Sequence, residues 1–260
     1  MPKIRCLACW IEPTTQQGKE DMFLVNENRF IAKQSNFSRI PGSPVAYWAS
    51  PQEILIYSNN QRLSERFETR NGMSTTNNDL FLKMWYEVLS QKIGLADYTA
   101  ETAKKSGKKW FPYNKGGEFR RWYGNRIYVV NWENDGYDLK AYVSARYGSY
   151  SKEIRSENRY FYESLTWSGV GASKSGFRYS PKGVIFDSGA NGLFAPTTNE
   201  LLYTLGLLNS LLVDRLLELI NPTINTGSGT VGNFPVMVCE SAFSAVITLS
   251  MQCVSISKID

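Results

Sequence analysis

Apolar positions recur at helical spacing most clearly between Leu201 and Ile220. Thr197 precedes this run, and Glu200 follows three residues later, a spacing typical of a capping box. Asn221 and the proline after it break the pattern. We expect one helix from 198 to 220, with a leucine stripe that forms either core or a partner surface. The stripe consists of Leu201, Leu202, Leu205, Leu208, Leu211, Leu212, Leu216, Leu219 and Ile220.

Elsewhere the apolar segments are shorter, and several predict strands. Ser50 before Pro51 predicts a helix start, because proline is favoured at the first helical position. Residues 14–21 are read as a polar turn, and residues 138–151 as helical or irregular. Strands are expected within 4–10, 22–32, 162–168 and 184–187.

Two polar segments interrupt these elements. Residues 69–79 lack any apolar period and are read either as a capping loop, in which Asn78 or Asp79 begins a helix through Trp85, or as a DNA-contacting loop. The two readings are given equal weight. Residues 169–176 form a glycine-serine loop without the ending of a phosphate-binding Walker loop. The chain after Val236 is apolar and β-prone and has no assigned place.

No repeat or low-complexity linker is visible, so one domain is the economical interpretation. A length of 260 residues is sufficient for such a core.

Charge is concentrated in the stretch 104–136. Between Lys104 and Arg126 there are eight Lys/Arg against one Glu, with six aromatic rings among them. A phosphate backbone attracts such charge, and aromatic rings and guanidinium planes suit unstacked bases. The alternative is a solvated basic face over a small aromatic core, with Trp110, Trp122, Tyr128 and Trp132 inside. Composition alone does not separate the two.

The composition excludes several kinds of chemistry. The chain has no histidine, which removes histidine-based triads and histidine-ligated zinc. Cys6 and Cys9 are read as reduced thiols, because no second cysteine pair stands at zinc-ribbon spacing. The net charge of +5 permits a nucleic-acid partner without requiring one. No apolar run is long enough for a membrane helix, and no signal peptide is visible, so we expect a cytoplasmic protein without membrane contact.

A complete base-modifying enzyme would show further motifs. No Pro-Pro pair occurs, so the catalytic tetrad of amino-methyltransferases is absent, and no glycine-rich turn for S-adenosylmethionine is visible. No carboxylate spacing argues for a metal site. The residues favour recognition without chemistry.

Several longer motifs, in order along the chain, resemble one family. They resemble the target-recognition region of PglX, the adenine-specific DNA methyltransferases of BREX phage-defence systems. The resemblance covers about residues 20–235. The motifs are Arg39 to Trp48, Gly72 to Leu82, Lys108 to Gly117, Arg120 to Asn125, Val129 to Gly136, Thr166 to Ser168, Phe177 to Tyr179 and Leu208 to Asn225.

The resemblance implies a single mixed α/β (α+β) domain, a DNA sequence-recognition module similar to TaqI-like target-recognition domains, with a Leu-rich helix near its end. In that family the catalytic domain is separate and precedes this region, so S-adenosylmethionine would belong there and not to this chain. We expect residues 1–235 to form the recognition domain and 236–260 a tail. The chain would not be catalytic alone but part of a site-specific methyltransferase.

The expected partner is double-stranded DNA, with Lys104 and Lys105 among the phosphate-steering cations. Two alternatives remain open: the chain completes a methyltransferase when a catalytic subunit joins it, or it is an interaction or inhibitory fragment that docks on a methyltransferase or other defence protein through its Leu-rich helix. The candidate DNA-binding residues are Thr75, Thr76, Asn77, Asn78, Lys108, Lys109, Asn114, Lys115, Gly116, Gly117, Arg120, Arg121, Arg126, Lys174 and Arg178.

Overall fold

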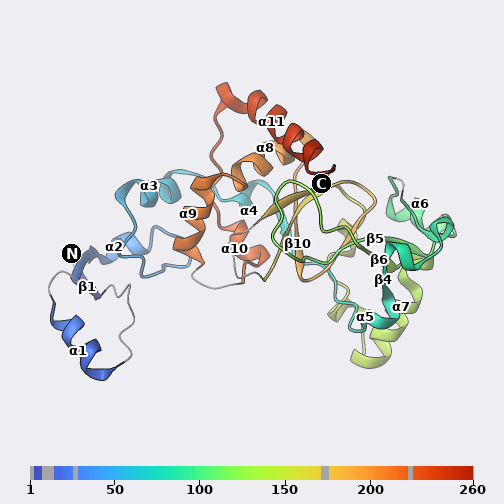
Figure 1. The fold of residues 1–260 in the computed structure, drawn as a ribbon, viewed down its shortest axis with the longest axis horizontal. Helices are drawn as coiled ribbons and strands as arrows, with labels where there is room; N and C mark the ends of the chain where they lie inside the picture. The colour runs from blue at the N-terminus through green and yellow to red at the C-terminus, as the bar shows by residue number, and fades with distance from the viewer. Residues whose placement is uncertain are drawn as a thin grey trace.

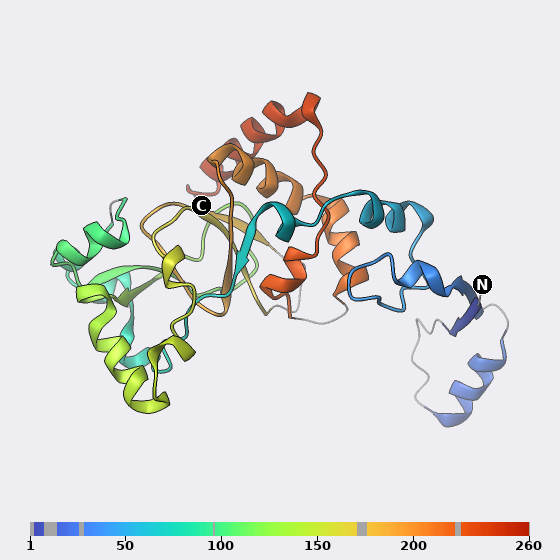
Figure 2. The same cartoon turned by 180° about the vertical axis from the view of Figure 1, so that it is seen from behind.

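The computed structural model describes residues 3–7, 15–25, 29–95, 97–170, 176–221 and 225–259. Its described part is a mixed α/β domain, which confirms the expected fold class. Figure 1 shows two four-stranded sheets side by side, with the N-terminal elements at one end of the molecule and α6 and α7 at the other. Figure 2 shows the same arrangement from behind.

The central sheet has the strand order β3-β10-β7-β8, and all of its pairs are antiparallel. Its two inner strands are buried almost throughout, including the polar Ser164, Thr166 and Asn191, and helices α8 and α10 pack against them. Trp167 and Leu193 are fully buried there. The strands are β3 (Glu68–Arg70), β7 (Ser164–Ser168), β8 (Phe177–Ser180) and β10 (Ala190–Phe194).

The second sheet has the order β4-β6-β5-β9, in which only the β5–β9 pair is parallel. Its core is aromatic: Trp132 packs edge-on against Tyr160, and Phe111 against Phe161. Trp132 is thus core, as one sequence reading expected. The strands are β4 (Leu82–Met84), β5 (Trp110–Asn114), β6 (Tyr128–Asn131) and β9 (Ile185–Phe186).

The chain passes directly from one sheet to the other between β9 and β10. Only the turn Asp187–Gly189 separates these strands, and Phe186 and Phe194 pack against each other across it, with ring centroids 5.6 Å apart. The two sheets are therefore covalently and sterically one unit.

The predicted Leu-rich helix is confirmed in place but divided in two. Thr197 caps α8 (Thr198–Leu208) by accepting a hydrogen bond from the Glu200 amide. The helix ends at Asn209, and α9 (Leu211–Ile220) follows. Most of the leucine stripe lies in the core, so that the expected partner surface is in fact buried; Leu211 and Leu212, at the break, are exposed.

The chain after Val236 is helical, and the β-prone interpretation was wrong. Residues Phe243–Ile256 form α11, which packs on α8. Two small helices precede it, α10 (Ser228–Gly232) and η6 (Glu240–Ala242). Apolar residues without period-two alternation form a helix here because α8 offers a surface to pack against.

In the N-terminal part, the strands expected within 4–10 and 22–32 lie at Lys3–Leu7 and Arg29–Lys33, one helix start is confirmed, and the expected turn is wrong. The predicted start of α3 (Pro51–Asn59) is confirmed: Ser50 and Glu53 exchange side-chain hydrogen bonds with each other's amides. The polar turn expected at 14–21 is a helix, α1 (Gln16–Leu24), capped by Thr15. The other elements here are β1 (Lys3–Leu7), β2 (Arg29–Lys33), α2 (Gln34–Phe37) and α4 (Leu63–Arg66), with β1 pairing antiparallel to β2.

The remaining helices surround the second sheet. The helix expected from Asn78 through Trp85 is shorter: α5 ends at Phe81, because the next residues pair with β6 as strand β4. Residues 138–151 are largely helical. The elements are α5 (Asn78–Phe81), η2 (Trp85–Glu87), η3 (Ser90–Lys92), α6 (Ala100–Lys105), α7 (Glu133–Tyr147), η4 (Tyr150–Lys152) and η5 (Glu157–Arg159).

Candidate nucleic-acid interface

The basic stretch is divided by strand β5. Residues 104–109 lie at its start and residues 115–127 beyond its end, and five residues of strand separate them by roughly 13–17 Å. The cations of this stretch therefore do not form one group but two, at opposite ends of a strand. We call residues 115–127 the basic-aromatic loop. In the view of Figure 1 it lies in front of the central sheet, near the end of α11.

Backbone hydrogen bonds fix the basic-aromatic loop to the edge of the central sheet. The Trp122 amide donates to the Phe177 carbonyl, and the Tyr179 amide donates to the Trp122 carbonyl, both at 2.8 Å. Trp122 thereby extends the sheet by one parallel bridge beyond β8. The loop is held by the fold at its middle, not only at its ends.

Two glycines turn the chain into the loop. Gly116 and Gly117 both have positive φ angles, 87° and 115°, which other residues adopt at a cost. A Cβ on Gly116 would lie 2.7 Å from the Gly189 carbonyl oxygen, so the two segments touch backbone to backbone. The Ser168 hydroxyl donates to the Gly117 carbonyl at 2.9 Å. Gly116 is buried, and only Gly117 is exposed.

Arg178 lies beneath the loop, with 2% of its surface exposed. Its guanidinium donates long hydrogen bonds to the Arg120 and Gly176 carbonyls and to the Ser168 hydroxyl, at 3.4, 3.5 and 3.4 Å. No carboxylate among the described residues pairs with it, and burial lowers its pKa to about 10. In this arrangement Arg178 does not reach a duplex, so we assign it to supporting the loop.

Arg121 is a second anchor. Its guanidinium donates to both oxygens of Asp214 on α9, at 2.8 and 3.1 Å, and the Asp214 side chain is 7% exposed. A paired, partly buried guanidinium of this kind stabilises the fold and is not free for phosphate.

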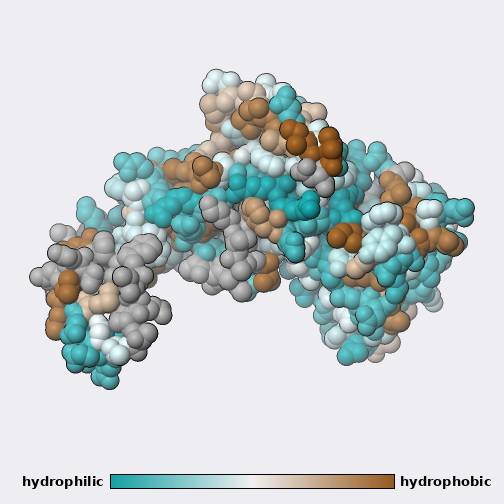
Figure 3. Space-filling view, in the orientation of Figure 1, coloured by the Kyte–Doolittle hydropathy of each residue, from teal (hydrophilic) through white to brown (hydrophobic). Residues whose placement is uncertain are grey.

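Two of the cations that remain at the surface lie over the Tyr123 ring. The Arg126 guanidinium and the Lys258 ammonium lie 5.3 and 5.2 Å from the centre of the Tyr123 ring. Arg120 is exposed and forms no ion pair with any described residue. Phe119 beside it is 50% exposed. We call Phe119, Arg120, Tyr123, Arg126 and Lys258 the Tyr123 cluster. Figure 3 shows a hydrophilic surface across the centre of the molecule, where the loop lies.

Three of the four lysines at the other end of β5, Lys105, Lys108 and Lys109, have local partners. The Lys108 ammonium donates to the Gln91 carbonyl at 2.6 Å. Lys109 lies 3.9 Å from Glu133 and over the ring of Trp110, while Lys105 pairs with Glu101. These interactions are partly or fully exposed and leave the lysines able to exchange partners.

The loop with Thr75 to Asn78 serves as a helix cap, and that reading is confirmed. Asn77 accepts a hydrogen bond from the Leu80 amide, and the Thr75 hydroxyl donates to Asn78 at 2.6 Å. Thr75 is buried, and Thr76 has a positive φ of 57°. The loop lies beside α7, where Asn77 reaches Tyr142. Asn78 is exposed, and DNA contact by this loop stays a prediction.

Asn114 and Lys115 lead to a buried polar network that sequence reasoning missed. Asn114 is buried and donates to Ser180, and the Lys115 ammonium is 4.0 Å from Asp187. Asp187 accepts from the Tyr113 hydroxyl and the Gly189 amide at 2.7 and 2.6 Å. Burial and this carboxylate raise the pKa of Tyr113. The run Asp-Ser-Gly at 187–189 was the available signal, since Asp commonly caps such turns.

The other expectations are placed as follows. Lys174 and Cys9 lie outside the described residues, and the Cys6 side chain is not described. Over the ranges described, no group of side chains is arranged to hold a metal ion. None of the described helices has the length and apolar character needed to cross a membrane.

Comparison with known proteins shows the class of protein that this chain resembles. Nearly the whole chain is similar in sequence to a part of bacterial adenine-specific methyltransferases. It is 40% identical over 258 residues to the adenine-specific methyltransferase PglX of Lacticaseibacillus casei (strain Zhang), which covers 95% of this chain and 21% of that protein. It is 36% identical over 207 residues to BrxX of Escherichia coli O9:H4 (strain HS), covering 78% of the chain and 16% of BrxX.

The resemblance to PglX is thereby confirmed, and the chain spans about a fifth of the length of these relatives. No protein-family model matches the sequence. Among solved structures, the type IIG restriction endonuclease BpuSI is similar with a TM-score of 0.41 and 11% identity, over 77% of this chain and 28% of that one. A similarity of that size does not by itself assign a shared fold.

Proposed function

We propose that this chain is a duplex-DNA-binding, target-recognition part of an adenine-specific DNA methyltransferase. The observation that carries the proposal is the basic-aromatic loop. It is anchored by Trp122, Arg121 and Arg178, yet Arg120 and the Phe119 ring are exposed and Arg126 is half-buried at its surface. Anchored loops that display cations and aromatic rings suit phosphate contact with base readout nearby.

The named activity of the relatives supports the same function. PglX and BrxX are adenine-specific methyltransferases, and such an enzyme has to find its target base within a sequence. The chain itself carries none of the catalytic motifs sought in the sequence. We therefore assign it recognition, with S-adenosylmethionine bound by another part of the methyltransferase.

The test is a salt-titrated binding assay with random duplex DNA. Single substitutions Arg120→Ala, Arg126→Ala and Lys258→Ala are each expected to weaken binding across sequences and to reduce the salt slope by up to about 0.9. Arg146→Ala is the matched control, because Arg146 is an exposed cation near the end of α7, away from the loop. Equal affinity and slope for the three loop variants and the wild type would overturn the proposal.

The assay also shows whether DNA contacts the cations at both ends of β5 or only those of the Tyr123 cluster. If DNA extends along the strand, Lys104→Ala and Lys108→Ala weaken binding as well. If the Tyr123 cluster acts alone, these two variants bind like the wild type. Contact of bases by Asn78 and Lys174 is the finer part of the proposal; alanine at either position is expected to relax sequence preference more than total affinity.

A further inference from the structure

Helix α11 is unusual for a surface helix because none of its 14 residues is charged. One side of it packs closely on α8. A Cβ on Gly206 would lie 2.7 Å from Val246 and 2.8 Å from the Ser250 hydroxyl, so the glycine allows the helices to touch. Ser250 and Val254 are buried in this contact, and Phe243 stacks on Tyr203 with ring centroids 4.8 Å apart.

Beside this contact, α11 carries apolar residues that the described chain leaves exposed. Leu249 is 59% exposed and Ile256 is 63% exposed. They are seven residues apart and thus share one edge of the helix. Figure 3 shows this helix as a largely hydrophobic surface at the top of the molecule. Exposed helix faces normally carry charges, so a continuous apolar edge indicates a contact surface.

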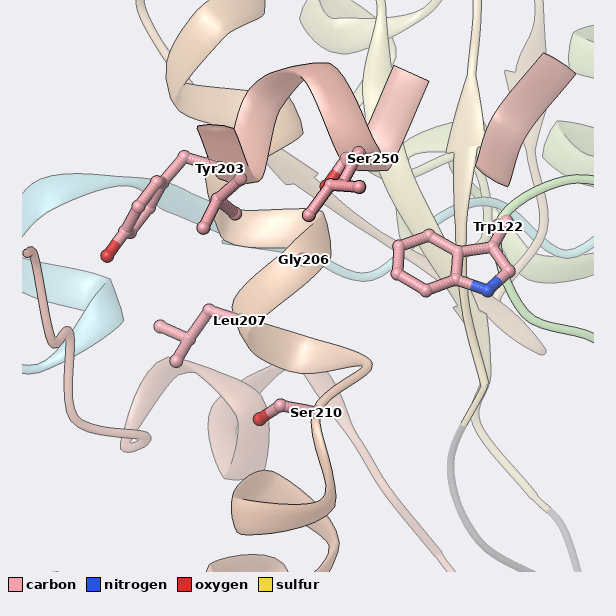
Figure 4. Close-up of a pocket in the computed structure, with 8 residues that line it drawn as sticks. Trp122, Tyr203, Gly206, Leu207, Ser210 and Ser250 are labelled. Atoms are coloured by element: carbon pink, nitrogen blue, oxygen red, sulfur yellow. The ribbon is translucent and has the colours of Figure 1, made fainter. Parts of the chain in front are cut away.

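A groove of about 320 Å³ continues this edge. Val246 and Leu249 line it from α11, Leu207 from α8, and Trp122 from the basic-aromatic loop. Figure 4 shows Trp122 on one side of the groove and Ser250 and Gly206 on the other. The groove has room for a few aliphatic side chains, as in recognition of an apolar segment by a groove.

We propose that this groove and the Leu249–Ile256 edge dock an apolar segment from the remaining part of the methyltransferase chain. About four-fifths of the related PglX lies outside the matched region, so a large covalent neighbour is available to cover the surface. The groove wall formed by Trp122 belongs to the loop proposed to bind DNA. Docking would thus place the rest of the enzyme against the back of that loop. The proposal rests on the relation to PglX and not on DNA binding.

The test is hydrogen exchange of α11 in two proteins: the isolated 260-residue chain, and the PglX of Lacticaseibacillus casei carrying this chain in place of its matching region. We expect the α11 amides to exchange at least about tenfold more slowly in the chimera. The double variant Leu249→Asp and Ile256→Asp should abolish this protection. Thr248→Asp with Ser255→Asp, also exposed on α11, should keep it.

Two outcomes would overturn the proposal. One is equal hydrogen exchange of the α11 amides in the chimera and in the isolated chain. The unfolding temperatures of both double variants are measured alongside, and loss of protection counts only in a variant that unfolds at the same temperature as its parent. The other is that the isolated chain forms a concentration-dependent dimer, and that only the variant with Leu249→Asp and Ile256→Asp is monomeric. A second copy of this chain would then be the molecule that covers the groove. Neither outcome bears on DNA affinity, so the two proposals fail separately.

Discussion

At the scale of single residues, neighbouring arginines have different roles. Arg120 and Arg121 are adjacent in sequence and identical in chemistry, yet one is exposed and the other pairs with Asp214 on a distant helix. The same holds for Arg178, which is buried beneath the loop and holds carbonyls in place. A cation in a basic stretch therefore cannot be assigned to phosphate before its burial and partners are known.

This difference gives the first prediction on stability. Arg121→Ala removes the partner that Arg121 provides to a largely buried carboxylate and should lower the free energy of unfolding by about 2 kcal/mol, because Arg121 is itself partly exposed. Arg120→Ala should change it by less than about 0.5 kcal/mol. Urea unfolding of the two variants checks this. Equal stability of the two variants would refute the structural role of Arg121. The arginines are substituted one at a time, because a double variant would combine a loss of stability at Arg121 with a loss of DNA binding at Arg120.

At the scale of elements, the sequence pattern located helices by their ends but did not find the break within one. Ser50 and Thr197 cap helices as predicted. The leucine stripe continues through Asn209, and nothing in its spacing signals that α8 ends there. The Asn209 side chain accepts from the Phe177 amide and donates to the Phe177 carbonyl. It joins the helix end to the strand that holds Trp122.

Asn209 connects the end of α8 to β8 by these two hydrogen bonds. Asn209→Ala removes the acceptor of the buried Phe177 amide, while the Phe177 carbonyl keeps the Trp122 amide as a donor, and should lower the free energy of unfolding by about 1–3 kcal/mol. Asn199→Ala, at an exposed position on the first turn of α8, is the control and should cost less than about 0.5 kcal/mol. Thermal unfolding measures both. A loss no greater than that of the control would exclude this role.

At the scale of the whole molecule, the last described helix packs on the rest of the described chain. α11 covers Tyr203 and Gly206 on α8, and Lys258 beyond it contacts Tyr123 in the basic-aromatic loop. The last helix therefore borders both the central core and the surface proposed to bind DNA.

Two shortened chains test this arrangement. A chain that ends at Ala242 loses α11 and should be less stable by more than about 2 kcal/mol, because the apolar contacts of Val254 and Phe243 are removed. A chain that ends at Ser257 keeps the helix, and should retain its stability while binding DNA more weakly through the loss of Lys258. Calorimetry and the salt-titrated assay distinguish the two. Unchanged stability of the shorter chain would show that α11 is an independent appendage.

The sequence by itself determined what depends on neighbouring residues: the capped helix starts, the strand at 164–168, the mixed α/β class and the resemblance to PglX. The tertiary structure alone decided which cations are free, where α8 breaks and that the last segment is a helix. The physical reason is distance along the chain. A cap closes within four residues, whereas Arg121 meets Asp214 across 93 positions and Asn209 meets Phe177 across 32.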